Sequence, residues 1–580
     1  MLYFAAALRM PCQAVLTRLS VALLVVLCAC RPARVPGELV VVVDAPVKDM
    51  DPRLATDGPS ARLSRMVFQG LTQVDPHGNP SLDLAAQLTE DGDPLVIKAV
   101  LRPDGRWHDG RPVTASDVAF TYQTVLDPRF ATPIGGEFRR RFSHVQADLR
   151  DPLVVRLYLR RPLATLWSDL VLGIAPAHLL QHHPDRRFSG PPIGSGPWQV
   201  DGPATGDAVA LRRVGPTPQN HAHRLVFRAI ADEGARSLSV LGGGADLAWS
   251  GLSPAILRGA AQTGRATLHA TPGVAWVYLG LNLRQPPLDQ PQVRQALAHG
   301  LDRQSLIDTL LGGLATHADG LFAPGHWART ALPRYPYDPL AAERLLDQAG
   351  LPRRSDGWRF SLEIKVSTSR LRRSIGRALA EQLRQIGIDA SVRPFELATF
   401  LGDVRAGRFQ AFLLQLPEPF EPDQLAWMLH SRNAAVRSVD VDSSSVYARL
   451  PRDGLPDPRW DSPLDGDPQC GAWRRRDWRE RLEALVLAPL GLEQARGLAN
   501  RTSYADPWLD CWVDLGRETT DRAKRFSLYA LAQQRAARDV PVVPLWWEHQ
   551  AVLAAPHLQM PALPADGRYS VLSEVRFTSE

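Results

Sequence analysis

The amino-acid sequence predicts an α/β fold, on the strength of three observations. Short continuous runs of β-branched and other apolar residues are typical of buried strands. Other segments carry apolar residues three and four positions apart, which is typical of helices that pack on one face. The two kinds of segment alternate from residue 39 almost to the end of the 580-residue chain, and this alternation is characteristic of α/β proteins.

The strands and helices can be placed in order along the chain. The strand-like segments are 39–43, 96–101, 153–159, 208–212, 224–229, 276–282 and 542–546. The helix-like segments are 62–71, one that starts at Thr114, then 291–299, 303–311, 339–349, 371–386 and 520–537. Thr114 with Asp117 three residues later predicts a capping box, and Asp302 predicts an N-cap.

Residues 432–519 differ from the rest of the chain. Pro, Asp, Arg and Trp are frequent there, and apolar periodicity is poor except at 478–487. A long irregular stretch in a compact protein is usually an insertion or a functional loop. We therefore expect an insertion at this place.

The composition narrows the function classes. Hydrophobic residues make up 45% of the chain, which is ample for a packed core, and the 15 Trp residues suit a large core or a cleft that stacks on ligands. The formal net charge is +6, but the 67 basic residues are interleaved with 61 acidic ones. Dispersed charge of this kind predicts solvated faces and no nucleic-acid partner.

The N-terminal residues predict an extracytoplasmic protein. Arg9 and Arg18 precede an uncharged, mostly apolar run at 19–29, which is too short to span a bilayer and suits a signal peptide. The run ends Leu27-Cys28-Ala29-Cys30 and resembles the lipobox of bacterial lipoproteins, in which Cys30 would be lipidated after cleavage. Residues 1–29 would then be a signal peptide and 30–38 a tether. An ordinary signal peptide that contains cysteine is the alternative.

Two cysteines remain in the mature chain, Cys470 and Cys511. In an oxidising compartment, two leftover cysteines about 40 residues apart are typical of a disulfide. Two unrelated thiols are the alternative.

Several motifs in order along the chain identify a family. They are 67–71 (VFQGL), 101–103 (LRP), 107–118 (WHDGRPVTASDV), 174–178 (IAPAH), 194–198 (GSGPW), 280–282 (GLN), 293–297 (VRQAL), 301–303 (LDR), 337–339 (YDP) and 349–351 (AGL). Together they resemble the large solute-binding proteins of ABC importers, the type that binds dipeptides, oligopeptides and nickel complexes. The block with His-Asp-Gly is specific, whereas Gly-Ser-Gly-Pro alone is weak. The resemblance covers residues 39–558 apart from much of the insertion.

The resemblance implies a two-lobe, clamp-like periplasmic-binding-protein fold of type II, with an extra subdomain in lobe one. Lobe one would comprise 39–271 and the returning segment 520–580, and lobe two would comprise 272–519. The two crossings would act as hinges, and ligand would bind between the lobes and stabilise their closed arrangement.

The resemblance also implies candidate ligand-binding residues. In peptide-binding members, an aspartate in lobe two binds the ligand ammonium group, and Glu418 stands at that place here, with Gln415 in place of a tryptophan. A solvated loop carboxylate is the alternative role for Glu418. Further candidates are Trp276, Asn282, Trp198, Met50 and Asp51, on segments that approach the cleft in the family. Core packing beside Tyr278 is the alternative role for Trp276.

The sequence therefore predicts a binding protein and no enzyme. Residues 194–196 do not form a nucleophile elbow, the glycines at 242–244 are not followed by Lys-Ser/Thr, and the histidine pairs lack a third metal ligand nearby. We expect no cofactor and no metal. The expected partners of this monomer are a short peptide or similar polar solute, the permease subunits of an ABC importer, and the membrane that holds the anchor. Alternatives are a nickel complex, an opine or an oligosaccharide as ligand, or a binding module for sensing or adhesion.

Overall fold

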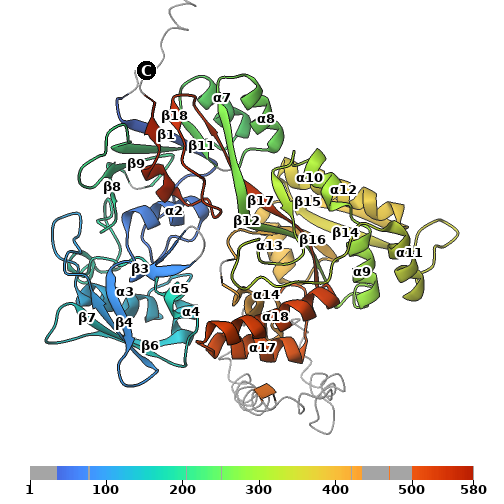
Figure 1. The fold of residues 1–580 in the computed structure, drawn as a ribbon, viewed down its shortest axis with the longest axis horizontal. Helices are drawn as coiled ribbons and strands as arrows, with labels where there is room; N and C mark the ends of the chain where they lie inside the picture. Colours follow the sequence, from blue (N-terminus) through green and yellow to red (C-terminus); the bar gives the residue numbers. More distant parts are fainter. Residues whose placement is uncertain are drawn as a thin grey trace, which may run out of the picture.

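One long mixed sheet runs through the molecule and joins its two halves (Figure 1). The computed structural model describes residues 35–75, 79–203, 205–249, 251–419, 421–433, 469–470 and 500–578. Cys30, the signal peptide, the tether before residue 35 and the segment 478–487 lie outside these residues. The strand order is β15 (Ile388–Phe395), β14 (Phe360–Ser367), β16 (Ala411–Leu416), β12 (Thr267–Leu281), β17 (Val542–Ala554), β11 (Leu247–Trp249), β1 (Glu38–Val43), β10 (Arg224–Ala229), β9 (Ala208–Arg213) and β8 (Trp198–Val200), with β13 (Ala315–His317) paired to β17.

A second, four-stranded antiparallel sheet forms a subdomain beside the first half. Its order is β4 (Ala85–Glu90), β5 (Val96–Leu101), β7 (Val154–Leu159) and β6 (Phe142–Ala147), and α3 (Ala115–Leu126) packs against it. The other helices are α2 (Gly58–Val67), α4 (Gly135–Arg141), α5 (Leu166–Asp169), α6 (Ala177–Leu180), α7 (Glu233–Leu241), α8 (Pro254–Gln262), α9 (Pro291–His299), α10 (Arg303–Thr309), α11 (Pro339–Gln348), α12 (Arg370–Gln385), α13 (Leu397–Arg405), α14 (Gln424–Leu429), α17 (Pro507–Glu518) and α18 (Arg522–Asp539). Two further antiparallel pairs of short strands join β2 (Thr72–Val74) to β3 (Pro80–Leu82) and β18 (Leu558–Gln559) to β19 (Arg576–Phe577).

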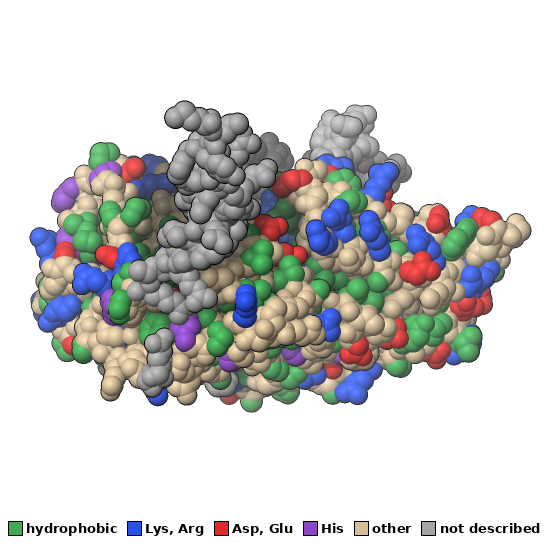
Figure 2. Space-filling model, turned by 90° about the horizontal axis from the view of Figure 1, so that it is seen from above, with side chains coloured by type: hydrophobic (Ala, Val, Ile, Leu, Met, Phe, Trp, Pro, Cys, Tyr) green, Lys and Arg blue, Asp and Glu red, His purple; other side chains and the backbone are tan. Residues whose placement is uncertain are grey.

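Charged side chains are mixed over the surface. Figure 2 shows basic and acidic side chains scattered across the face in view. Many arginines pair with a nearby acid, as Arg156 does with both Asp91 and Asp148. None of the helices in the described residues has the length and apolar character needed to cross a bilayer.

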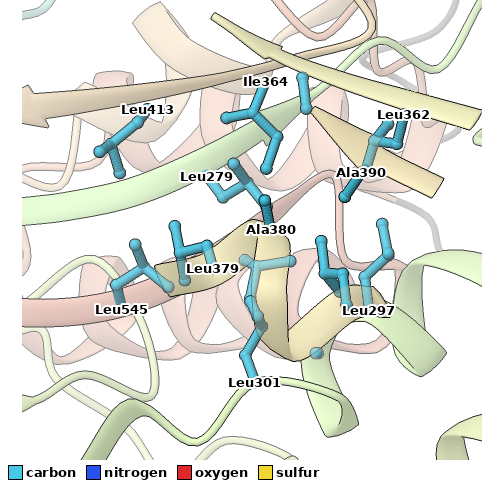
Figure 3. Packing of buried hydrophobic residues seen from close by; sticks show 14 of the residues in the cluster. Leu279, Leu297, Leu301, Leu362, Ile364, Leu379, Ala380, Ala390, Leu413 and Leu545 are labelled. Carbon is cyan, nitrogen blue, oxygen red and sulfur yellow. The ribbon is translucent and has the colours of Figure 1, made fainter. Parts of the chain in front are cut away.

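Each half of the long sheet has its own apolar core. In the second half, strands β14, β15 and β16 pack their buried side chains against α9 and α12. Figure 3 shows Leu362 and Ile364 from the sheet facing Leu379 and Ala380 of α12. In the first half, Leu39, Val41 and Val43 of β1 pack with α2 and the C-terminal segment. The cores are separate, which is what a two-lobe molecule requires.

Strands β12 and β17 cross between the halves. The start of β12 pairs with the end of β17 beside β11, whereas Ala275 and the residues after it pair with β17 beside β16. The register shifts between Thr271 and Ala275, so a bulge lies at the crossing. Bulges twist and bend a strand locally. The bulge coincides with the lobe boundary that the sequence predicts at residue 271.

The return to the first lobe differs from the expectation at residue 520. Tyr529 and Ala532 of α18 belong to the same buried cluster as Trp276 and Leu425 of the second lobe. The apolar face of α18 therefore keeps this helix in the second lobe. Its packing favours a return within β17 over the predicted return at residue 520.

Part of the predicted insertion is an ordered helix. α17 starts at the N-cap Asp506, whose side chain accepts a hydrogen bond from the backbone N–H of Leu509, and Pro507 is at the first helical position. Leu509 and Val513 are fully buried in the cluster of the second lobe. Cys511 on the same helix forms a disulfide with Cys470. The part of the predicted insertion that forms α17 therefore belongs to the core of the second lobe.

Two sequence motifs hold each other in place. The N–H of His108 donates to the carbonyl of Gly194, and the N–H of Gly194 donates to His108 Nδ1 at 3.3 Å. His108 Nε2 lies 2.9 Å from the carbonyl of Gly196, so the neutral ring with hydrogen on Nε2 satisfies both contacts. Burial lowers the pKa of His108 and favours this neutral form. The His-Asp-Gly and Gly-Ser-Gly-Pro blocks are therefore partners in the fold.

Two predicted helix caps are confirmed, whereas the helix predicted at 62–71 lies four residues earlier, at Gly58–Val67, because Asp57 caps it. Thr114 and Asp117 form both hydrogen bonds of a capping box at the start of α3. Asp302 caps α10, because its side chain accepts a hydrogen bond from the N–H of Ser305 at 3.0 Å.

Candidate functional site

A large cleft lies where the first lobe, its subdomain and the second lobe meet. Its volume is about 1990 Å³. The first lobe contributes α2 and the loop at residues 195–197, the subdomain contributes α4 and α5, and the second lobe contributes the segment after β16 with α14. A cleft between lobes is the default place for a ligand in a two-lobe protein.

The local sequence explains how α2 supplies charge to the cleft. Leu63, Met66 and Val67 are buried, so one face of α2 packs on the core. Arg62 and Arg65 lie off that apolar stripe and line the cleft. Helical spacing alone therefore places two guanidinium groups at the cleft wall.

Glu418 lies opposite these arginines. It lies two residues after the end of β16, and its side chain is 22% exposed. Its Oε2 lies 3.5 Å from Nη1 of Arg65, and its Oε1 lies 4.0 Å from Nη2 of Arg62. These are ion pairs at distances too long for strong hydrogen bonds. The Glu418 carboxylate thus interacts with the two arginines mainly through charge, and it accepts no hydrogen bond from the residues that the structure describes.

Two neighbouring carboxylates join the second lobe to the subdomain. Ser168 Oγ donates to Glu421 at 2.7 Å, and Arg525 donates to the other oxygen at 3.0 Å. Asp423 pairs with Arg517 at 2.6 Å and lies 3.7 Å from Arg141 of the subdomain. These contacts cross the cleft and stabilise the arrangement in which its two sides approach each other.

Burial raises the pKa values of two carboxyl groups in the cleft, those of Asp83 and Asp169. Burial raises the pKa of Asp83 to about 6, although Gln69 Nε2 donates to it at 2.6 Å and favours the charged form. Burial also raises the pKa of Asp169 to about 6, against the opposing effect of its ion pair with Arg141. Both carboxyl groups are costly to ionise where they stand.

Replacing Asp83 by asparagine is expected to stabilise the protein near neutral pH. A folded-state pKa of about 6 lies above the unfolded value of about 4, so the folded state holds this proton between those pH values. The contribution of Asp83 to the free energy of unfolding therefore falls as the pH rises from about 4 to 6, whereas asparagine does not titrate. The variant should gain about 2–3 kcal/mol relative to wild type at pH 7.5 and nothing at pH 4. Urea unfolding at both pH values measures this difference, and a gain of the same size at both would contradict the argument.

Of the six residues named from the sequence as ligand-binding candidates, all of which the structure describes, only Glu418 lines the cleft. Met50 is buried in the core of the first lobe, and Asp51 is buried in an ion pair with Arg53. Trp198 is fully buried, and its Nε1 donates to Ser573 Oγ at 2.9 Å. These three side chains support the first lobe.

The remaining two candidates support the second lobe. Asn282 is buried, and its amide donates to the carbonyls of Gly407 and Phe409. Trp276 is buried and stacks on Tyr278 with ring centroids 4.5 Å apart, which is the core-packing alternative. Trp276 lines a separate pocket within the second lobe and does not line the cleft.

Comparison with known proteins finds binding proteins both among family models and among curated relatives. A model described as bacterial extracellular solute-binding proteins, family 5 Middle, matches residues 79–435. The glutathione-binding protein GsiB of Salmonella paratyphi A is 27% identical over 373 residues, which is 62% of this chain and 70% of that protein. GsiB of Escherichia coli O1:K1 / APEC is 27% identical over 369 residues, which is 61% of this chain and 69% of that protein.

Solved structures share the fold. NikZ from Campylobacter jejuni in complex with Ni(L-His) has a TM-score of 0.71 and 22% identity, covering 94% of this chain and all of that one. The oligopeptide-binding protein AppA from Bacillus subtilis, in complex with a nonapeptide, has a TM-score of 0.69 and 19% identity, covering 93% and 99%. The α/β fold with two lobes, predicted from the sequence, is confirmed by these likenesses.

Proposed function

Since the chain belongs to the bacterial extracellular solute-binding proteins of family 5, we propose that it captures a short peptide outside the cytoplasm and delivers it to the permease subunits of an ABC importer. The relatives named for glutathione and the fold neighbours solved with peptides support a peptide as ligand. The protein acts by binding and release, without catalysis.

The observation that carries this proposal is the state of the Glu418 carboxylate. A peptide ammonium group must find a carboxylate when it leaves water, because a buried charge without a partner is costly. Glu418 lines the cleft and accepts no hydrogen bond from the described residues, so an ammonium group can supply the missing donors. Arg62 and Arg65 stand beside it to bind a carboxylate of the same ligand.

The lipid anchor belongs to the same proposal. The run Leu27-Cys28-Ala29-Cys30 supports lipidation of Cys30 and attachment of a monomer to a membrane on the extracytoplasmic side. A lipid chain contributes roughly 0.8 kcal/mol per buried methylene, so more than one chain gives stable attachment. The binding lobes would then act close to the importer.

Closure of the lobes around the ligand is the proposed mechanism. The bulge of β12 and the partner segment of β17 form the crossings, and the contacts of Glu421 and Asp423 join the two sides. A ligand that touches both sides favours the closed arrangement by its differential affinity. The importer would distinguish the two arrangements.

Thermal-shift screening of the chain from residue 31 onward tests the ligand class. Ligands would be di- to pentapeptides, glutathione, nickel–histidine and oligosaccharides. Binding to the native state raises the melting temperature in proportion to RT ln(1 + [L]/Kd). A rise with free peptides is expected. A rise only with the nickel complex or with sugars would keep the transport class and reject the peptide. No rise with any ligand would favour a module for sensing or adhesion.

A further inference from the structure

A second pocket lies inside the second lobe and shares no lining residue with the cleft. Its volume is about 400 Å³, within the range of about 300–1,000 Å³ that is usual for small-molecule sites. α14 separates the two spaces. Gln424, Ala426 and Trp427 line the cleft, whereas Leu425, Met428 and Leu429 line this lobe-two pocket.

Most of the pocket wall is apolar. α14 contributes Leu425, Met428 and Leu429, α18 contributes Ala536 and Ala537, and β17 contributes Val542 and Pro544. Exposed residues, among them Pro333 and Arg334, line one part of the pocket, and the buried Trp276 lines another. The pocket therefore runs from the surface into the lobe.

The polar side chains that line the pocket include three pure hydrogen-bond donors, Trp276, Arg303 and Arg334. Trp276 is only 2% exposed, and its Nε1 is buried with no hydrogen-bond partner among the residues that the structure describes. A buried N–H without an acceptor is costly and rare. An acceptor atom of a bound molecule would remove that cost.

The charge of the pocket is positive. Arg303 is buried, and its guanidinium donates only to carbonyls, those of Ala298, Pro544 and Tyr335. Neither Arg303 nor Arg334 forms an ion pair with a carboxylate of the described residues. The single acid of the lining, Asp319, is already paired with Arg329 at 3.2 Å. Burial and the neighbouring Arg303 lower the pKa of His317, which is consistent with this positive field.

We propose that the lobe-two pocket binds a small organic carboxylate with an apolar body, at a site separate from the cleft. The carboxylate supplies an acceptor for Trp276 Nε1 and a negative counter-charge for Arg303 and Arg334. The apolar body covers the wall formed by α14, α18 and β17, and gains roughly 25 cal/mol for each Å² of apolar surface removed from water. A cation would meet unpaired arginines there, and an uncharged chain would leave them without a counter-charge.

Isothermal titration calorimetry with octanoate, 1-octanol and octylamine tests the proposal. Octanoate is expected to bind one to one, and the other two probes are expected to bind at least about tenfold more weakly, since a hydrogen bond to a charged group is worth about 1.5–3 kcal/mol. Trp276→Phe keeps an aromatic ring of smaller size, removes the indole N–H and should weaken octanoate about tenfold. Ala537→Phe fills the pocket and should abolish octanoate binding, whereas Leu531→Phe on the exposed side of the same helix should not.

Arg334→Gln provides a variant at an exposed position, where folding is not at risk, and Arg150→Gln is its exposed control in the subdomain. Weaker octanoate binding in Arg334→Gln alone supports the proposal. Absence of octanoate binding to the wild type, equal binding of 1-octanol, or binding that survives Ala537→Phe would overturn it. Competition between octanoate and a peptide that requires Glu418 would place octanoate in the cleft, and would overturn it as well.

Discussion

Replacing Asp510 by alanine is expected to lower the free energy of unfolding by about 3–5 kcal/mol, because it removes one partner from a buried set of charged and hydrogen-bonded side chains. Asp510 is fully buried on α17. One oxygen accepts the backbone N–H of Ser431 at 2.9 Å and lies 3.4 Å from His430 Nδ1, and the other accepts Ser431 Oγ. Burial raises the pKa of Asp510, while His430 and Ser431 favour its charged form. Alanine leaves the N–H and hydroxyl of Ser431 without this acceptor, and removes the carboxylate beside Nδ1 of His430.

Guanidinium unfolding under oxidising conditions, followed by tryptophan fluorescence, measures this loss. Glu381→Ala is a suitable control, because Glu381 is 66% exposed and, among the described residues, pairs with Arg384 one helical turn away. Exposed pairs of this kind contribute about 0–1 kcal/mol. If both variants lose an equal, small amount of unfolding free energy, the contacts of Asp510 with His430 and Ser431 do not hold α17 to the end of α14.

Gly194→Ala is expected to destabilise the protein by about 3 kcal/mol and to weaken ligand binding. A Cβ atom at Gly194 would overlap the carbonyl oxygen of Val67 and lie 2.7 Å from its carbonyl carbon. Backbone cannot rotate away as a side chain does, so either α2 or the loop must shift. Overpacking of a close contact costs about 1–3 kcal/mol, and sometimes more. The shift would also displace Ser195 and Gly196, which line the cleft, and Arg65 near the end of α2.

Gly190→Ala provides a matched control four residues earlier in the same loop, where a Cβ would meet no atom within 4 Å. Its stability should equal that of wild type within about 0.5 kcal/mol. Urea unfolding and peptide titration of both variants test the difference. A Gly194→Ala variant that unfolds and binds like Gly190→Ala would refute the close approach of this loop to α2.

Much of the fold could be predicted because its strands and helices carry local patterns. The strands at 96–101 and 224–229 appear at the predicted bounds, since each is a continuous apolar run between turns. β12 begins at Thr267, well before the predicted start at residue 276. Pro272 and Gly273 suggest a break there, but pairing with β17 on both sides of the bulge keeps the strand continuous. β12 and β17 lie far apart in the sequence, so their pairing cannot be predicted from a local sequence pattern.

α17 was missed for a different reason. Its charged and aromatic residues obscure the apolar spacing of Leu509 and Val513, although Asp506-Pro507 is a recognisable helix start. The Cys470–Cys511 disulfide could be expected from the number of cysteines, whereas the buried contact of Asp510 with His430 depends on tertiary packing.

The sequence pointed to one residue of the cleft lining, Glu418, and did not point to the arginines beside it. Glu418 lies in a motif that can be matched by position, so the sequence leads to it. The arginines near it lie on α2, about 350 residues earlier in the chain, so the contact depends on how the two lobes approach each other. Trp276 and Trp198 lie in matched segments as well, but strand pairing turns their side chains into the two cores.

Calorimetric titration with trialanine and N-acetyl-trialanine tests most directly the claim that the cleft captures a peptide through Glu418. The account predicts one-to-one binding of trialanine, with a loss of roughly 30-fold or more on acetylation and in Glu418→Gln, since removal of one partner from a buried charge pair costs about 2–5 kcal/mol. Glu363→Gln removes a carboxylate of similar exposure outside the cleft lining, paired with Arg393 at 3.2 Å, and should bind as wild type does. Equal affinities for both peptides, unchanged by Glu418→Gln, would contradict the account.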